Sequence, residues 1–448
     1  MTQPEGAGQP PVQSSESTSW IERTGFTRLF EALHLAVNFT ALRAAFVGVA
    51  LTCLAGFALD WVWPSSSRPV VYANGLNELQ KYRLERGPAV DVSGLLQDSE
   101  KTGSIGVFAL LLNHARLAAN AATEALVTPS FDGLYAVLAF AFSAIVWLFA
   151  VHPVYGVLFA TMGFIIWGHS GGAVARAVAM QFARRDPISF RDASEFSRAR
   201  LMNFVLAPLV FPAVILLIGL VLWLIGLVGA IPAVEILVGI AFPIVIVLGI
   251  LAGFCAILFL LTAPILTPSI AVDDLDPWEA FSQTIGFVLG KPWKYAVCLF
   301  GAGIYGAVCI LILKVFLALS LWLAGTFLGS SMNWGDAYAL DAAGKNVSAQ
   351  DKLSAMWQPP QPGDGRPFIG TFEGETLRFP SSYGRSFIRA WIWVLWGVVA
   401  AFAVSFFYAS GTIVYFIMRR DLNDTDMEDV YLEGSADGAS SAKAVGGS

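Results

Sequence analysis

The pattern of apolar and polar positions is dominated by one long hydrophobic stretch, residues 204–263, which contains no Lys, Arg or Asp. About 20 consecutive apolar residues are enough to cross the hydrocarbon core of a bilayer. The stretch holds one such run on each side of Ile231-Pro232, so it predicts a helical hairpin with spans at 204–229 and 236–263. Glu235 is its single charged residue and lies beside the turn.

Further apolar runs predict spans at residues 41–63, 154–175, 295–328 and 387–418. These runs do not alternate between apolar and polar residues as the strands of a membrane barrel do. Within lipid, only helices and closed barrels satisfy the backbone hydrogen bonds. The sequence therefore predicts an all-α polytopic membrane protein with about six transmembrane helices in hairpin repeats, the first five of them in a membrane domain over residues 19–328.

Two segments, residues 20–38 and 105–127, place apolar side chains at helical spacing and predict amphipathic helices at the membrane surface. Residues 134–151 permit two interpretations: a span of their own, or a helix that stays shallow before the span at 154–175. The connector 176–203 favours the second, because it is rich in arginine and short basic loops stay in the cytoplasm. With a cytoplasmic N-terminus, one crossing fits between the first span and this connector.

The remaining polar segments are predicted to lie outside the bilayer. Residues 329–386 form an extracytoplasmic loop whose second half has a small core with strands, built on Trp357, Phe368, Phe372 and Phe379. Residues 1–18 and most of the acidic tail, 419–448, are too polar to bury a core and are predicted to be disordered. Because Arg419-Arg420 closes the last span, both termini are assigned to the cytoplasmic side of the cell (inner) membrane.

Composition supports the membrane assignment and excludes one class of partner. Hydrophobic residues make up 56% of the chain and charged residues 13%, against about 25% charged residues in soluble domains. The net charge of −6 provides no basic stripe to neutralise phosphates, so no nucleic-acid partner is expected. All four cysteines lie in apolar runs without C-x-x-C spacing, which favours packing and predicts no metal site or cofactor.

An internal repeat follows the predicted spans. Asp186-Pro187 and Asp276-Pro277 each follow a span and suit the first positions of a short helix. The tail from Arg419-Arg420-Asp421 looks like a truncated third copy. The repeat predicts that the two connectors and the tail lie on the same side of the membrane.

These landmarks carry a resemblance. Residues 184–204, 264–295 and 415–431 resemble a family of polytopic bacterial membrane proteins, best represented among planctomycetes, and the resemblance implies a fold and no known reaction. The stretch from Pro277-Trp278-Glu279-Ala280 to Gly290-Lys291-Pro292-Trp293 is similar to loops of the membrane domains attached to some glycerophosphodiester phosphodiesterases. The phosphodiesterase's catalytic carboxylates and metal site have no counterpart here, so no activity is implied.

Two glycine motifs resemble catalytic or nucleotide-binding signatures. The run from Gly168 to Gly172 matches G-x-S-x-G around Ser170, but an apolar helix, not a strand, precedes it. A serine nucleophile also needs a nearby histidine, so close helix packing at Gly168 and Gly172 is the better interpretation. The G-x-G-x-x-G run that starts at Gly301 and Gly303 lacks a βαβ context and likewise predicts a small-residue packing face.

Charged residues supply the remaining candidate sites. Lys314 and Glu235 are both expected near the outer interface, which predicts an intramembrane ion pair, with snorkelling of Lys314 to the headgroups as the alternative. Five arginines of the connector are candidates for contacts with anionic lipid headgroups, and setting the topology is the equally weighted alternative. They are Arg184, Arg185, Arg191, Arg198 and Arg200.

These observations predict a multi-pass membrane protein of structural, assembly or regulatory type, not an enzyme, with the lipid bilayer as its evident partner. A small-solute permease or transporter built on repeated hairpins is the alternative. Only scattered serines and threonines, such as Thr52 and Ser320, lie within the spans. That scarcity weighs against an ion or proton pathway. An intramembrane hydrolase ranks third, and the sequence identifies no protein partner or oligomeric state.

Overall fold

The computed structural model describes residues 26–72, 75–86, 101–127, 130–232, 234–340, 346–349, 351–361, 367–372 and 376–431. The N-terminal segment predicted to be disordered, 1–18, lies outside the described residues, and so does the tail beyond residue 431.

Six helical segments of the described chain are long and apolar enough to cross a bilayer, which confirms the predicted fold class: the chain is an all-α polytopic membrane protein. They are Phe39–Val62, Pro153–Arg184, Leu201–Gly229, Phe242–Asp273, Pro292–Met332 and Ser381–Asn423.

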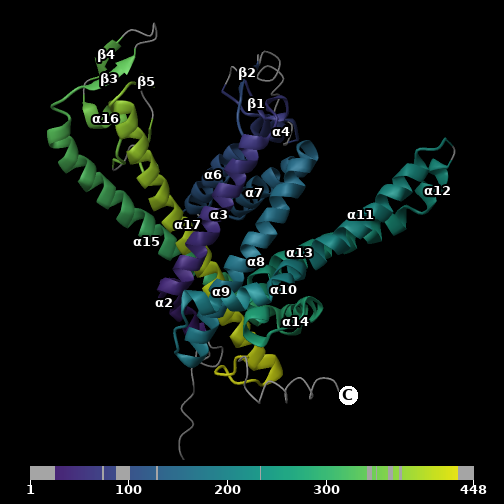
Figure 1. The fold of residues 1–448 in the computed structure, drawn as a ribbon. Helices are drawn as coiled ribbons and strands as arrows, with labels where there is room; N and C mark the ends of the chain where they lie inside the picture. Colours follow the sequence, from purple (N-terminus) through teal and green to yellow (C-terminus); the bar gives the residue numbers. More distant parts are fainter. Residues whose placement is uncertain are drawn as a thin grey trace, which may run out of the picture.

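The helices form a compact base from which three arms diverge (Figure 1). We call them the central arm, the C-terminal arm and the hairpin arm. The base contains several short helices and one end of each long helix. Its short elements are η1 (Phe26–Phe30), α2 (Glu31–Ala36), α9 (Phe190–Ala199), α10 (Leu201–Leu206), η3 (Ala207–Leu209) and α14 (Pro277–Gly290).

The central arm pairs α3 (Phe39–Val62) with α8 (Pro153–Arg184). Between them in sequence, α6 (Val107–Val127) and α7 (Phe131–Val151) form a hairpin. Asp60, near the end of α3, accepts hydrogen bonds from the first turn of α6, and α7 leads directly into α8 through His152. The α6–α7 hairpin therefore begins and ends at the same end of the central arm. This is expected of a helix pair that does not cross the bilayer.

The far end of the central arm carries a small polar cap. It consists of η2 (Ser65–Ser67), α4 (Glu78–Arg86) and the antiparallel pair β1 (Val70–Tyr72) and β2 (Lys101–Ser104), with Val70 opposite Ser104. The predicted surface helix at 105–127 thus corresponds to α6, which packs against α7 and α3 instead of lying alone.

The C-terminal arm consists of α15 (Pro292–Met332) and α17 (Ser381–Asn423), joined by a second cap. The cap contains α16 (Lys352–Met356) and an antiparallel sheet in the order β4-β3-β5, formed by β4 (Asn346–Ala349), β3 (Ala337–Leu340) and β5 (Thr376–Leu377). Trp357 is buried and Phe368 and Phe372 pack around it, as predicted for this loop. Phe379 is 76% exposed, so its assignment to the core is wrong.

The hairpin arm consists of α11 (Val210–Gly229), α12 (Glu235–Ile240) and α13 (Phe242–Asp273). The chain reverses between Gly229 and Glu235, next to Ile231-Pro232. Helix α13 continues ten residues beyond the predicted end at 263, through Pro264 and Pro268. The prediction ends too early because hydropathy marks only the part of a helix that lies in lipid. Packing in the base stabilises the remaining turns of α13.

The base positions the two repeat connectors side by side. Helix α14 begins at Pro277 with Asp276 as its N-cap, as the repeat predicts. Helix α9 instead begins at Phe190, where the Ser189 hydroxyl accepts a hydrogen bond from the Asp192 N–H, so the predicted cap at Asp186-Pro187 is wrong. Serine is as good an N-cap as aspartate, and its position three residues later decides the start of the helix.

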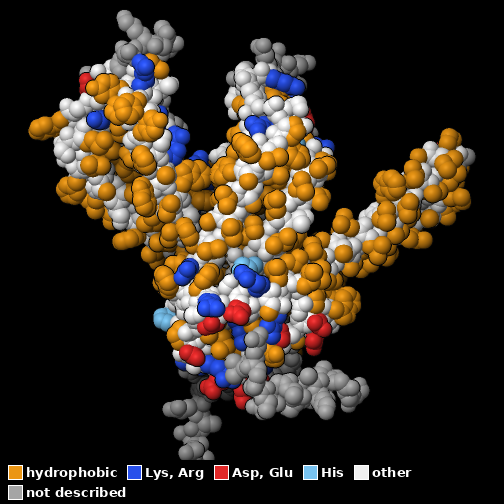
Figure 2. All heavy atoms as spheres, viewed as in Figure 1, with side chains coloured by type: hydrophobic (Ala, Val, Ile, Leu, Met, Phe, Trp, Pro, Cys, Tyr) orange, Lys and Arg blue, Asp and Glu red, His pale blue; other side chains and the backbone are white. Residues whose placement is uncertain are grey.

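Apolar and charged side chains occupy different parts of the surface. Figure 2 shows hydrophobic side chains over all three arms, whereas acidic side chains gather on the base. Lys and Arg side chains lie on the base and on the caps at the far ends of the central and C-terminal arms. An apolar zone between two charged zones is the pattern expected for a protein that spans a bilayer.

Candidate functional site

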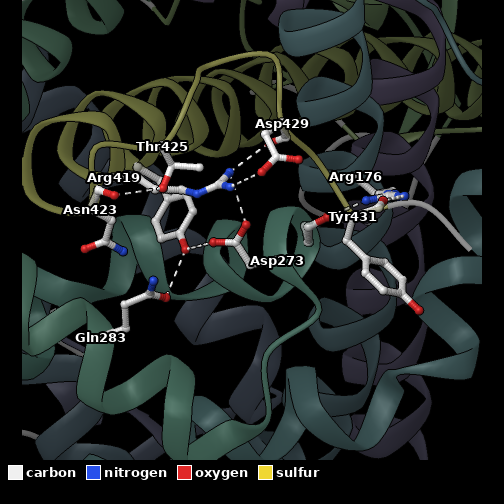
Figure 3. Close-up of polar contacts among 10 residues, drawn as sticks. Arg176, Asp273, Gln283, Arg419, Asn423, Thr425, Asp429 and Tyr431 are labelled. Atoms are coloured by element: carbon white, nitrogen blue, oxygen red, sulfur yellow. Dashed lines mark hydrogen bonds and ion pairs between the residues drawn. The ribbon is translucent and has the colours of Figure 1, made fainter. Parts of the chain in front are cut away.

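The most connected polar cluster lies in the base, where α13, α14 and α17 meet the C-terminal segment (Figure 3). Arg419 Nη1 lies 3.1 Å from the Asp273 carboxylate and donates to the Asp429 carbonyl at 2.8 Å. The Tyr415 hydroxyl lies within hydrogen-bond distance of Asp273 and, at 3.0 Å, of the Gln283 side-chain oxygen. One buried arginine and one partly buried carboxylate therefore join three elements, and we call this group the base cluster.

Two further arginines tie α8, α13 and the tail together. Arg176 is 5% exposed and donates to the carbonyls of Ala271 at 2.8 Å and Tyr431 at 2.7 Å. Arg200 forms a two-point ion pair with Asp274, with Nη2 at 2.9 Å from Oδ2. Both guanidinium groups lie 4.2 Å from the centre of the Phe196 ring, on which they stack.

Three spans end in the same way in the base. Helices α8, α13 and α17 are followed by Arg185, Asp274 and Asp424, which adopt left-handed conformations with φ of 57°, 57° and 50°. Such a residue at the C-cap turns the chain away from the helix axis, and a residue other than glycine pays a steric penalty there. The three endings coincide with the three copies of the sequence repeat.

In this arrangement the charged groups connect the ends of separate helices to one another and to the C-terminal segment. The guanidinium and carboxylate groups of the base cluster bind one another and backbone carbonyls, so their hydrogen-bonding capacity is used within the fold. In the described part of the chain, no group of three or more His, Cys, Asp or Glu residues is placed to hold a metal ion.

The arginines proposed as lipid contacts fall into two groups. Arg184, Arg191 and Arg198 are exposed on the base. Arg185 pairs with Glu31 at 3.0 Å, although it remains exposed. Arg200 differs from the others because its guanidinium is paired with Asp274, and its contact with lipid stays a prediction.

The predicted ion pair between Lys314 and Glu235 is not formed. Lys314 lies in α15, where its ammonium group is 5.8 Å from the centre of the Phe368 ring. Glu235 starts α12, at the tip of the hairpin arm, which diverges from the C-terminal arm (Figure 1). The prediction fails because equal depth in the membrane does not make two helices neighbours.

The four glycines predicted to permit close helix packing have different surroundings. A Cβ at Gly168 would lie 2.9 Å from Val205, and one at Gly172 would lie 2.6 Å from the Ser197 hydroxyl, so both permit close packing of α8. At Gly303 a Cβ would meet nothing within 4 Å, so Gly303 makes no close helix contact within the described chain. Gly301 is half-buried in the same helix.

Ser170 has no hydrogen-bond partner among the described residues and is buried against α3, beneath Gly48. The neighbouring His169 instead shares a hydrogen bond of 3.1 Å with Ser194 of α9. Ser170 is therefore packed between helices, and no described residue forms a hydrogen bond with its hydroxyl.

Sequence reasoning missed the base cluster and also the buried carboxylate of Asp60. It is 8% exposed and accepts hydrogen bonds from the N–H groups of Phe108 (3.0 Å) and Ala109 (3.1 Å) and from the Tyr155 hydroxyl (2.8 Å). A carboxylate at a helix N-terminus is favoured by the helix dipole. The sequence feature that could have identified this carboxylate is an acidic residue close to the end of an apolar run. The same feature is present at Asp273.

The cap of the central arm holds a second titratable pair. His152 Nε2 lies 3.4 Å from the Glu78 carboxylate, which also accepts the Val70 N–H at 3.1 Å. Burial raises the pKa of Glu78, but the His152 side chain and the Val70 N–H together outweigh burial and hold that pKa below its ordinary value. The pair joins α4 to the junction of α7 and α8.

In comparisons with protein-family models, curated proteins and solved structures, nothing matches this chain.

Proposed function

We propose that this chain is a structural or assembly protein of the membrane, in which the base holds three arms apart so that other membrane helices pack between them. The observation that supports this most is the exposure of the arms. In the most apolar part of α13 and of α15, only 6% of the residues are buried within the chain. Most of their surface is therefore available to lipid or to another protein.

The hairpin arm has the features of a helix-packing surface. Because lipid tails are as apolar as the side chains, helices in membranes associate through close packing at small residues. Gly249 and Gly253 are four residues apart on α13, both are exposed, and a Cβ at either would meet nothing within 4 Å. This spacing is the one at which two helix backbones approach most closely.

The base is proposed to face the cytoplasm of a cell whose inner membrane holds the arms. Six arginines lie in residues 176–203, and short arginine-rich connectors remain on the side where they are synthesised. A reporter enzyme that works only in the cytoplasm is expected to be active when it is fused after Arg185. A reporter that works only outside the cytoplasm is expected to be active when it is fused after Trp334. A periplasmic signal from the Arg185 fusion would overturn the orientation.

The permease alternative predicts a water-filled path between spans. The cavity between α13, α15 and α17 is lined mainly by apolar and small residues, among them Leu299, Ala307, Ala403 and Phe406. A cysteine at Ala307, in a chain whose four native cysteines are replaced, is expected to resist thiol reagents that do not cross membranes. Labelling from both sides of the membrane would favour the permease.

Photo-crosslinking in native membranes tests the assembly proposal. A photoreactive residue at Ile250, which is 67% exposed on the hairpin arm, is expected to give a discrete protein adduct. Trp334, which is 91% exposed at the far end of α15, is the control position, where no discrete protein adduct is expected.

The variant G249L/G253L is expected to abolish the Ile250 adduct, because leucine prevents close approach of a second helix. G219L is the matched control, since Gly219 is also open on the neighbouring α11. Lipid adducts alone at Ile250, or equal loss with G219L, would contradict the proposal.

A further inference from the structure

A cavity of 570 Å³ lies between the central and C-terminal arms and is lined by residues of both. Helix α6 contributes Leu112, Asn113 and Arg116 to its lining, and α17 contributes Arg389, Ile392, Trp393 and Trp396. The segment Pro367–Phe372 of the second cap closes one side. The volume lies within the range of about 300–1,000 Å³ that is usual for small-molecule sites.

Two arginines line this cavity, one from each arm. Arg116 comes from α6 and Arg389 from α17, and both line it. The Arg116 guanidinium donates to Asn113 at 3.3 Å, and that of Arg389 lies 5.1 Å from the Phe372 ring centre. Neither has a carboxylate within ion-pair distance among the described residues. The cavity therefore carries two positive charges that the described part of the fold leaves uncompensated.

The rest of the lining is apolar and aromatic. Phe57, Ile392, Trp393 and Trp396 contribute to the wall. Tryptophan is enriched where a membrane protein passes from hydrocarbon to headgroups. Arg389 lies eight residues from the start of α17 at Ser381, about 12 Å along the helix. The cavity is therefore at headgroup depth, at the end of the molecule opposite the base.

We propose that this cavity binds one anionic phospholipid. Its phosphate lies between Arg116 and Arg389, and its acyl chains follow Phe57, Ile392 and Trp396 into the space between the diverging arms. Guanidinium groups pair with phosphate oxygens in a two-point geometry. The apolar wall favours a lipid over a free phosphate, because a free phosphate would leave that wall in contact with water. This inference depends on the membrane fold and not on the proposed assembly function.

Native mass spectrometry of the full chain in detergent tests the site. The probes are a phosphatidylglycerol, a phosphatidylcholine with the same chains, and glycerol 3-phosphate. The double variant R116Q/R389Q is expected to bind phosphatidylglycerol about 30-fold more weakly, since each basic residue near an anionic surface contributes roughly a factor of five. R191Q/R198Q removes two exposed arginines of the base and is expected to leave this binding unchanged.

Each alternative gives a different result. Equal binding of phosphatidylglycerol to R116Q/R389Q and to the wild type would overturn the proposal, and so would equal binding of phosphatidylcholine. Tight binding of glycerol 3-phosphate would identify a site for soluble phosphates. A loss with R191Q/R198Q instead would place the lipid on the base.

A second variant tests the acyl-chain part of the site. Leu112→Trp keeps both arginines and fills the cavity, so it is expected to weaken phosphatidylglycerol binding at least tenfold. An unchanged thermal unfolding midpoint in detergent shows that the variant still folds. Unimpaired binding in a folded Leu112→Trp protein would also contradict the proposed lipid position.

Discussion

Replacing Arg419 by methionine tests whether the base cluster stabilises the fold. Methionine keeps the length and the apolar stem of the side chain but removes the charge. Asp273 then loses the cation 3.1 Å away and keeps only the neutral contact with Tyr415. The two side chains are 8% and 16% exposed, so water replaces the lost partner only in part.

The magnitude follows from this burial. Removing one partner of a buried ion pair costs about 3–5 kcal/mol, because the other charge remains buried without compensation. The contact of Arg419 with Asp429 adds little, since the Asp429 side chain is 63% exposed and exposed pairs contribute about 0–1 kcal/mol. We expect R419M to lower the free energy of unfolding by about 3 kcal/mol. R419M/D273N should cost less than the sum of the single changes by about 2 kcal/mol, because it removes both charges.

Unfolding in mixed detergent micelles, followed by tryptophan fluorescence, measures these changes. Arg28 provides the control, because it pairs with Glu31 at the similar distance of 3.0 Å but is 47% exposed. R28M should change the free energy of unfolding by less than about 1 kcal/mol. Additive effects of R419M and D273N, or a loss with R419M no larger than with R28M, would refute the argument.

Two other substitutions test packing and pH dependence. A Cβ at Gly411 would lie 2.0 Å from the Pro264 carbonyl oxygen, so G411A should destabilise the chain by about 2–3 kcal/mol, whereas G163A, at an open position, should not. Because the pKa of Glu78 is lowered on folding, its contribution to stability is present above its ordinary pKa of 4.5 and is lost as the pH falls below it. E78Q should therefore flatten the acid side of the thermal stability profile, unlike E85Q, whose side chain is 46% exposed.

The positions of the membrane-spanning helices can be predicted from the sequence, because they depend on the local composition of the chain. Lipid imposes a length and an apolar character on each span, so the helices are found where the apolar runs predict them. Their ends are less predictable: α8 continues from the predicted end at 175 to Arg184, and α17 from 418 to Asn423. These last turns form within the base, where packing against neighbouring helices replaces lipid as the stabilising environment.

Contacts between arms depend on information that one sequence does not contain. Depth in the membrane can be counted along a helix, and this count led to the incorrect pairing of Lys314 with Glu235. Lateral position depends on which helices pack together, and so on features such as the approach of Gly411 to Pro264. The base cluster was missed for the same reason, because Asp273 and Arg419 are far apart in sequence and adjacent only in the fold.

The distribution of strong interactions explains why a base with diverging arms is stable. Within lipid, apolar side chains gain little by leaving the hydrocarbon for one another, so long helices need small residues or polar contacts to stay together. In the base, Arg419–Asp273, Arg200–Asp274 and Lys294–Asp421 each join separate helices. The ends of the spans are therefore fixed while their apolar lengths remain available to bind lipid or other helices. A loss of the base cluster should release the arms from one another before it unfolds any single helix.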